Sequence, residues 1–249
     1  FRAMAVTVTF VGAGDAFGSG GRFNTCILVD GAAVRFTIDF GATSLTALNQ
    51  LGIEHNSIDA VLLTHMHGDH FGGLPFMLLD AMLGARRQRP LTIAGPKNLQ
   101  ARVTAAIDAL FPGSSAMTPK FPLHFVELAV GQINDVLGLA VTPYAAKHTP
   151  TTDPTALRVA VDDRIVSYSG DGEWTPELNK ASHDADLFIA ECYFHGRAVT
   201  GHMSYPDIQQ HKEDFAAKRM ILTHLGPDML ANRAAVAEQC AEDGLVVTL

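Results

Sequence analysis

Short runs of apolar, β-branched residues recur along the chain and predict strands. The first run, residues 6–11, alternates apolar and polar side chains, which is the period of a strand with one buried face. Ten further runs share this character: residues 26–29, 34–38, 60–63, 91–94, 139–142, 157–161, 164–168, 187–190, 220–222 and 245–248. Their number predicts a core built mainly from β-sheet.

Five stretches with apolar residues at helical spacing lie between these strands. They cover residues 44–51, 74–83, 99–110, 206–215 and 232–241, and Gly52 and Pro112 end the first and third. Early strands follow one another through hairpin-like turns, whereas the helices come between later strands of each half. This mixed order predicts an α/β fold in which two sheets are sandwiched by helices.

Length and composition are those of an ordinary globular protein and exclude disordered and fibrous classes. Of the 249 residues, 47% are hydrophobic and 18% are charged, and we expect one domain over residues 1–249. Residues 1–3 are expected to be a cloning remnant before a natural start at Met4. The formal net charge of -8 repels polyanions and anionic membranes at long range, which opposes binding to them.

Cysteine usage and hydropathy indicate a reducing compartment. Cys26, Cys192 and Cys240 lie far apart without a Cys-x-x-Cys pair, which excludes a disulfide framework and a thiolate zinc knuckle. No stretch approaches the roughly 18 uncharged apolar residues of a membrane span. The first residues do not resemble a signal peptide. We therefore expect a cytoplasmic protein with no membrane partner.

One short segment carries four candidate metal ligands. It follows an apolar strand and precedes a helix, so its side chains can converge beyond the strand end. Imidazole and carboxylate groups suit zinc, manganese or iron. The four candidates fall within six residues: His65, His67, Asp69 and His70.

Three later candidates, His148, Asp171 and His224, also terminate β-rich runs. Each can therefore meet the first cluster at one sheet edge. The seven ligands divide into two sets of three, with one carboxylate left to bridge. A carboxylate bridge holds two cations about 3.5 to 4 Å apart, the spacing at which a shared hydroxide can attack in line.

At these residues the chain resembles the metallo-β-lactamase superfamily, whose hallmark is a His-x-His-x-Asp-His motif after a strand. The resemblance covers nearly the whole chain and implies a four-layer αββα sandwich with the site at one sheet edge. It implies that Asp39, in an early Asp-x-Gly motif, supports the site without binding metal. The implied ligands are His65, His67 and His148 for one metal, Asp69, His70 and His224 for the other, and Asp171 as the bridge.

Two features resemble the ribonuclease Z-like branch, which includes cyclic-nucleotide and other phosphodiesterases and arylsulfatase-like members. One is the Gly-rich opening at residues 10–14, followed by residues 22–25. The other is Glu191 followed by His202, similar to motifs whose Glu and His assist proton delivery to the leaving oxygen. The implied catalytic residues are Asp69, Glu191 and His202.

The chain also departs from this branch. Ala190 stands where the first of these motifs has His, and Met203 interrupts the second. Only 22 residues, 149–170, separate His148 from Asp171, which leaves no room for the long arm that transfer-RNA-processing members insert there. Together with the net charge of -8, this argues against long nucleic acid and favours a small phosphodiester.

We therefore expect a dinuclear metal-dependent hydrolase in which a metal-bridging hydroxide attacks a small phosphodiester. The expected cofactors are two divalent ions, Zn²⁺ first, with Mn²⁺ or Fe²⁺ as alternatives. The same site would serve a lactone, thioester, sulfate ester or β-lactam hydrolase, an iron-dependent redox enzyme, or a metal-stabilised binding protein. A small molecule is the expected partner, and the resemblance implies a homodimer.

Two groups of residues receive no functional interpretation. The basic run of Arg86, Arg87 and Arg89 is interpreted as a solvated cluster after a helix. The remaining histidines lack partnered spacing and are interpreted as surface residues: His55, His124, His183, His195 and His211.

Overall fold

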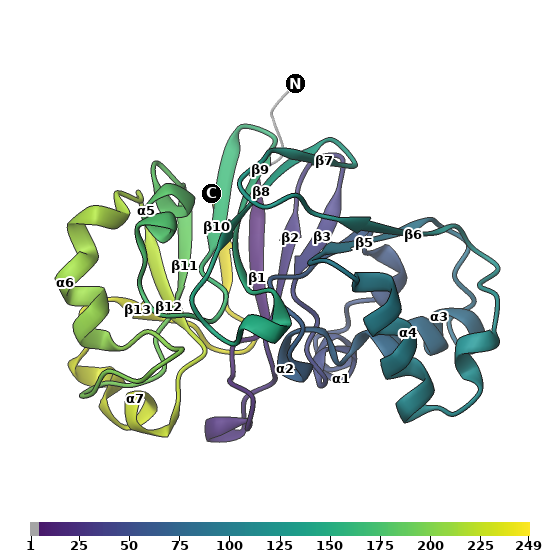
Figure 1. Cartoon of the computed structure of the whole chain (residues 1–249), viewed down its shortest axis with the longest axis horizontal. Coiled ribbons are helices and arrows are strands. Elements are labelled where there is room, and N and C mark those ends of the chain that lie inside the picture. The colour runs from purple at the N-terminus through teal and green to yellow at the C-terminus, as the bar shows by residue number, and fades with distance from the viewer. Residues whose placement is uncertain (1–4) are drawn as a thin grey trace.

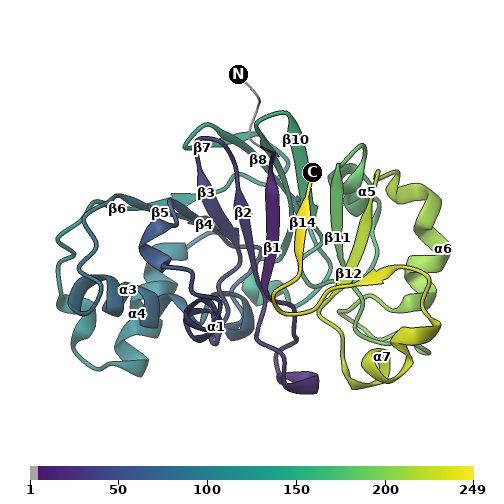
Figure 2. The same cartoon turned by 180° about the vertical axis from the view of Figure 1, so that it is seen from behind.

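The computed structural model describes residues 5–249 as two β-sheets packed face to face, with helices on both outer surfaces (Figure 1). Figure 2 shows the same layers from behind, with α3 and α4 at one side and α6 at the other. The expected remnant at residues 1–3 and the start at Met4 lie outside the described residues.

Seven strands form each sheet. The first sheet has the order β14-β1-β2-β3-β4-β5-β6, and the second has the order β13-β12-β11-β10-β9-β8-β7. The first sheet comprises β1 (Thr7–Gly12), β2 (Cys26–Asp30), β3 (Arg35–Ile38), β4 (Ala60–Leu62), β5 (Leu91–Gly95), β6 (Leu123–Glu127) and β14 (Val246–Thr248). The second comprises β7 (Asn134–Val136), β8 (Leu139–Ala145), β9 (Thr155–Val161), β10 (Arg164–Tyr168), β11 (Leu187–Glu191), β12 (Met220–Thr223) and β13 (Gln239–Cys240).

The helices fall into two sets, one for each outer surface. The α-helices are α1 (Ser44–Gln50), α2 (Gly68–Phe71), α3 (Leu74–Leu83), α4 (Leu99–Leu110), α5 (Pro176–Ser182), α6 (Tyr205–Phe215) and α7 (Pro227–Asn232). Short 3-10 turns are η1 (Ser19–Gly21), η2 (His55–Ser57), η3 (Ser114–Ala116), η4 (Pro150–Thr152) and η5 (Arg233–Ala235).

Alternation along the strands explains why each sheet is covered on both faces. In β2, Ile27 and Val29 belong to the core between the sheets, whereas Cys26 and Leu28 face the outer helices. Successive side chains of a strand point to opposite faces of the sheet. A strand with apolar residues on both faces therefore needs a packing partner on each side. The sequence of β2 thus requires a helical layer outside the sheet.

The layers of the predicted αββα sandwich are confirmed. Leu48 of α1, Met77 of α3 and Val103 of α4 pack in one outer core, against the first sheet. The second sheet is covered by α5, α6 and α7 through Leu178, Ile208 and Met229. The central core between the two sheets draws residues from both.

Strand direction brings several chain segments to one edge. Strands β3 to β6 run parallel in the first sheet, and β10 to β12 run parallel in the second. Loops that leave the carboxyl ends of parallel strands lie at the same edge of their sheet, where α/β proteins place their ligands. The loops after β4, β10 and β12 carry predicted metal ligands.

The predicted helix at residues 232–241 is wrong. Helix α7 instead ends at Asn232, η5 follows, and β13 pairs in parallel with β12. The structure also contains β6, β7, β13, α2, α5 and α7, which the residue patterns did not indicate. Among residues 5–249, no helix has the length and apolar character needed to cross a bilayer.

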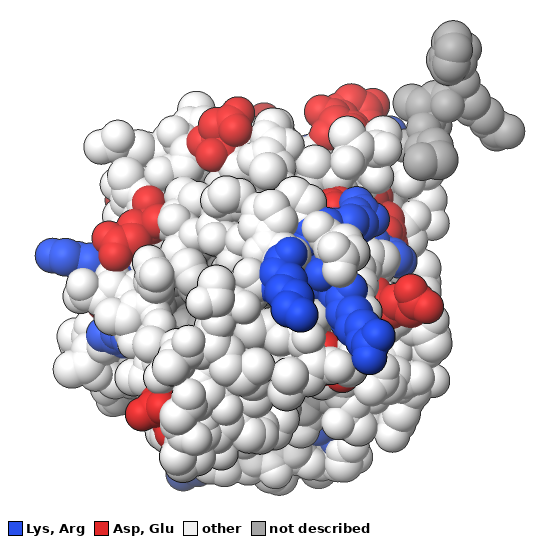
Figure 3. Space-filling model, turned by 90° about the vertical axis from the view of Figure 1, so that its right-hand side faces the viewer, with Lys and Arg blue, Asp and Glu red and all other residues white. Residues whose placement is uncertain are grey.

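Two of the residues interpreted as solvent-exposed are buried. His55 is 5% exposed and its Nε2 lies 2.7 Å from Asp80 Oδ2. Arg87 is 2% exposed, because its guanidinium donates to backbone carbonyls including that of Ile58, while its neighbour Arg89 pairs with an aspartate on the surface. On the face that carries α3 and α4, several lysine or arginine side chains gather at one place, with others scattered around it (Figure 3).

Candidate metal centre

The seven predicted ligands converge from both sheets into two adjoining groups. Within each group, one ligand atom from every residue lies within 4.8 Å of the others. The first group follows β4 and β8, and the second draws on α2 and the ends of β10 and β12. The first group is His65, His67 and His148, and the second is Asp69, His70, Asp171 and His224.

Asp171 lies between the two groups. Its Oδ2 is 4.0 Å from Nε2 of His65 and 4.0 Å from Nε2 of His148, both in the first group. Its Oδ1 is 3.2 Å from His70 Nε2, and its Oδ2 is 3.5 Å from His224 Nε2, in the second group. One carboxylate therefore faces both groups, as a bridging ligand requires.

The chemistry of these buried atoms fits divalent cations. His70 Nε2 and Asp171 Oδ1 are buried and have no hydrogen-bond partner among the described residues. A buried polar atom without a partner is costly, and a shared cation satisfies both atoms at once. Imidazole and carboxylate donors in these numbers suit zinc, and the residues present fit two such ions.

The ionisable side chains around Asp171 shift one another's pKa values. Burial opposes protonation of His224, but the charge of Asp171 and a hydrogen bond that His224 donates to Asp69 outweigh it and raise the pKa of His224 to about 9. Burial, helped by the positive charge of His70, instead holds the pKa of His65 well below its usual range. The buried carboxylates thus demand positive charge, which metal ions can supply in place of protons.

Asp39 hydrogen-bonds to one candidate ligand, His70, and to Thr64, the residue before another. It is fully buried, and its Oδ2 accepts a hydrogen bond from His70 Nδ1 at 2.7 Å. It also accepts from the backbone N–H of Thr64 and from the Thr64 hydroxyl, each at 2.8 Å. Since Nδ1 of His70 is held by Asp39, Nε2 is left to face the other ligand atoms.

Thr64 is a supporting residue that sequence reasoning missed. Its hydroxyl oxygen lies 3.0 Å from His65 Nδ1, and its carbonyl accepts from Thr155 in the second sheet at 2.9 Å. Thr64 therefore links Asp39, His65 and the facing sheet. A threonine before the histidine motif carries no recognisable signal, because its role depends on partners far away in sequence.

Backbone strain accompanies the site. Asp39 has φ 61° and His224 has φ 57°, both in the left-handed region that side chains other than glycine seldom adopt. Such conformations cost about 1–3 kcal/mol and persist where the surrounding structure fixes them. The hydrogen bonds of Asp39 and the burial of His224 supply that constraint here.

A glycine after Asp39 brings α2 close to β3. A Cβ added at Gly41 would lie 2.1 Å from the Asp69 carbonyl oxygen and 2.5 Å from Asn24 Cβ. We expect Gly41→Ala to displace Asp69, to destabilise the fold by about 1–3 kcal/mol in urea denaturation and to weaken zinc binding. The matched control is Gly68→Ala in α2, where an added Cβ meets nothing within 4 Å. Equal effects of the two variants would contradict this account.

His202 and Glu191, the pair expected to assist proton delivery, adjoin the candidate metal ligands. His202 Nδ1 hydrogen-bonds to Glu191 Oε1, and Glu191 Oε2 accepts from the backbone N–H of Gly172 at 2.7 Å. Burial opposes the charged form of His202, but its bond to Glu191 outweighs burial and raises the His202 pKa. Ligand atoms of Asp171, Glu191, His202 and His224 lie within 4.8 Å of one another. The pair therefore forms one wall of the site.

A backbone contact that the sequence did not reveal ties His148 to the loop before His202. His148 Nδ1 lies 2.6 Å from the carbonyl oxygen of Gly201, which can accept a hydrogen bond from it. The His148 and His202 ring centroids are 4.9 Å apart. The same loop thus positions a candidate ligand and the candidate acid.

Fold and site together define a member of the metallo-β-lactamase superfamily, in its ribonuclease Z-like and phosphodiesterase branch. The chain belongs to the Anti-Pycsar protein Apyc1 family, whose family model matches residues 6–245.

Curated relatives include proteins named ribonuclease Z and Anti-Pycsar protein Apyc1. A ribonuclease Z of Lachnospira eligens is 24% identical, over 92% of this chain and 93% of that protein. A ribonuclease Z of Lachnoclostridium phytofermentans is 36% identical, but that match spans only 43% of the chain and 33% of that protein. The Anti-Pycsar protein Apyc1 of Paenibacillus sp. (strain J14) is 38% identical, over 36% of this chain and 37% of that protein.

Solved structures share the fold over nearly the whole chain. The metallo-β-lactamase fold protein YhfI from Bacillus subtilis has a TM-score of 0.75 at 22% identity, covering 98% of this chain and 100% of that chain. Zn²⁺-bound PqqB from Methylobacterium extorquens has a TM-score of 0.71 at 14% identity, covering 98% of this chain and 100% of that chain. At these identities the likeness shows the fold alone.

Proposed function

We propose that this metal-dependent hydrolase is a dinuclear, zinc-dependent phosphodiesterase that acts on a small phosphodiester. The observation that carries the proposal is the meeting of two ligand groups with the His202–Glu191 pair at one sheet edge. The names of relatives, ribonuclease Z and Anti-Pycsar protein Apyc1, agree with this class of chemistry.

The ligand groups assign the residues that would hold the cofactors. His65, His67 and His148 would hold one ion, and Asp69, His70 and His224 the other, with Asp171 shared. When bound, two divalent cations supply Lewis acidity that activates water and offsets negative charge on a phosphoryl group. Zinc is the preferred ion because histidine nitrogens dominate the donor set.

His202 is the group proposed to protonate the leaving oxygen. Glu191 is fully buried and holds Nδ1 of His202, whose side chain remains 25% exposed. The second ring nitrogen is therefore available for proton transfer, and the raised pKa favours the protonated ring that a general acid requires. Glu191 acts as a positioning residue through His202.

The connection between His148 and Asp171 supports a small substrate. Residues 149–170 are largely used by η4, β9 and β10, which belong to the second sheet and its connections. No segment remains there for an arm that would grasp a folded nucleic acid. The net charge of -8 also disfavours a long polyanion.

The direct test is hydrolysis of bis(p-nitrophenyl) phosphate by protein loaded with zinc or manganese. We expect turnover with metal and none after chelation, followed by turnover of cyclic nucleotides in a substrate panel. Turnover of lactones, thioesters or sulfate esters alone would overturn the phosphodiesterase proposal while keeping the hydrolase class.

We expect His202→Ala to discriminate between leaving groups. A general acid contributes typically 10²–10⁴-fold when the leaving oxygen is basic. The variant should therefore lose about a hundredfold or more in kcat for an alkyl diester and far less for bis(p-nitrophenyl) phosphate. His183→Ala is the matched control, since the His183 side chain is 67% exposed and belongs to neither the ligand groups nor the His202–Glu191 pair. An equal loss for both substrates would argue against the acid role.

A further inference from the structure

The connection between β11 and α6, residues 192–204, carries His202, and we call it the acid loop. It contains no helix or strand, and backbone bonds hold its two ends together. One of these bonds runs from the N–H of Tyr193 to the carbonyl oxygen of Met203 at 2.9 Å. The stretch just before His202 is held in addition by other parts of the fold.

Gly201 ties the acid loop to two other segments through its backbone. Its N–H donates to Glu173 Oε1 at 2.9 Å, and its carbonyl oxygen lies 2.6 Å from Nδ1 of His148. Gly201 has φ 83°, in the left-handed region that favours glycine, and an added Cβ would lie 3.4 Å from His148 Nδ1. The residue directly before His202 thus has both of its backbone polar groups engaged.

Glu173 is itself anchored to the segment that carries His148. Its Oε2 accepts a hydrogen bond from Lys147 Nζ at 2.6 Å, and its backbone N–H donates to the Lys147 carbonyl at 3.0 Å. Lys147 directly precedes His148, and Glu173 lies two residues after Asp171. One carboxylate therefore joins the acid loop to the segments that follow β8 and β10, each of which carries a candidate ligand.

The contact between His148 and Gly201 decides which ring nitrogen of His148 faces the ligand group. With its proton on Nδ1, directed at the Gly201 carbonyl, His148 leaves Nε2 unprotonated toward the first group. This Nε2 lies 3.1 Å from His67 Nδ1 and 4.0 Å from Asp171 Oδ2. A displacement of Gly201 would therefore disturb the orientation of His148 and, through the next residue, that of His202.

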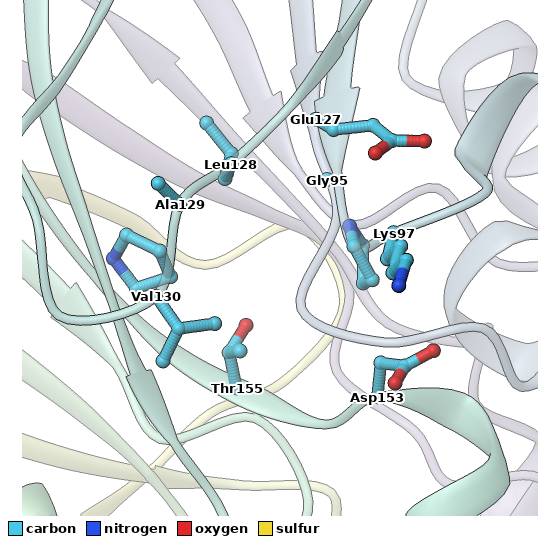
Figure 4. Close-up of a pocket in the computed structure, with 10 residues that line it drawn as sticks. Gly95, Lys97, Glu127, Leu128, Ala129, Val130, Asp153 and Thr155 are labelled. Carbon is cyan, nitrogen blue, oxygen red and sulfur yellow. The ribbon is translucent and has the colours of Figure 1, made fainter.

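A second glutamate, Glu127, holds a backbone N–H outside this network. Its Oε1 accepts from the N–H of Asn98 at 2.7 Å, at a cavity of about 440 Å³ at the ends of β5 and β6 (Figure 4). None of the residues that line this cavity belongs to the ligand groups, to the acid loop or to the Lys147–Glu173 pair. Glu127 therefore provides a matched comparison for Glu173.

We propose that Glu173 is a positioning residue of the site, acting through the backbone of Gly201. With Gly201 held in place, His148 is oriented for metal binding and His202 for proton transfer. The inference rests on the proposed function for the role of His202, and it gives that site a residue beyond its ligands and its proton donor.

Two measurements on Glu173→Ala test this role. In competition with a chromophoric chelator, the variant should bind zinc about tenfold more weakly, at the lower end of the range for residues that orient a ligand. At saturating zinc, kcat for an alkyl diester should fall about tenfold more than kcat for bis(p-nitrophenyl) phosphate, because only the alkyl leaving group needs a well-placed acid. In the His202→Ala background this additional loss should disappear, because both substitutions act on the same step.

Two further variants complete the test. Glu173→Gln keeps an oxygen that can accept from the Gly201 N–H, so both quantities should return to within about twofold of wild type, since an exposed ion pair contributes little. Glu127→Ala, which also removes the acceptor of a backbone N–H, should match wild type.

Equal zinc affinities in Glu173→Ala and Glu127→Ala would overturn the proposal, as would a loss of kcat in Glu173→Ala that is the same for both substrates. If the protein hydrolyses no phosphodiester but zinc affinity falls in Glu173→Ala alone, the proposed function fails and the role of Glu173 in orienting His148 stands.

Discussion

Replacing Asp171 by Ala is expected to lower kcat/KM on bis(p-nitrophenyl) phosphate by about a thousandfold or more, equivalent to about 4 kcal/mol of transition-state stabilisation. Asp171 Oδ2 lies 4.0 Å from Nε2 of His65 and 3.5 Å from Nε2 of His224, so the variant removes the donor that both groups share. Metal content, measured by mass spectrometry of the digested protein, should fall together with activity.

Asp163→Ala is the control for this variant, because Asp163 lies in the preceding β9–β10 hairpin with its side chain 72% exposed. It should keep wild-type metal content and turnover. If Asp171→Ala retained both metal and rate, Asp171 would not be the shared ligand and the dinuclear assignment would have to be abandoned.

Replacing Asp39 by Asn is expected to weaken zinc binding by about 10–100-fold, the range typical of residues that orient a metal ligand. An asparagine can still accept from the Thr64 N–H, but then its amide group faces His70 Nδ1 as a donor. His70 must then carry its proton on Nε2, the nitrogen that faces the other ligands. Competition with a chromophoric chelator measures the change in affinity.

The chain offers a matched control in a second Asp–His pair. Asp80 Oδ2 lies 2.7 Å from His55 Nε2, the same separation as between Asp39 and His70, but neither residue belongs to the ligand groups. Asp80→Asn should leave zinc affinity unchanged. Equal losses in both variants would indicate a general effect on stability instead of an effect on the tautomer of His70.

The features predicted from the sequence, the layers of the fold and the candidate ligands, are those that depend on local residue patterns. The αββα layers follow from two-residue alternation in strands such as β2, and the ligand motif lies within six residues after β4. The candidate ligands further along the chain could be predicted because each follows a strand, and the ends of neighbouring parallel strands meet at one edge of their sheet. The ligand assignments themselves remain predictions until metal is measured.

The features that sequence patterns did not predict depend on contacts with residues distant in the chain. Residues 232–241 have helix-favouring composition, but pairing of Cys240 with Leu222 draws the segment into a sheet. Strand β7 is short and polar and forms only against β8. The burial of His55 depends on Asp80, 25 residues away. The Trp174–His211 stack depends on the meeting of the segment before α5 with α6.

The position of β14 has a consequence for how the protein is made. This strand pairs with β1, so that Val247 lies opposite Val8, and Asp243 just before it accepts a hydrogen bond from Ala13, 230 residues away along the chain. During synthesis β1 leaves the ribosome before β14, so one edge of β1 stays unpaired until the residues between these two strands have emerged. Contacts between segments so distant in sequence slow folding, and the unpaired strand edge can aggregate in the meantime. Nascent chains are therefore expected to need chaperones.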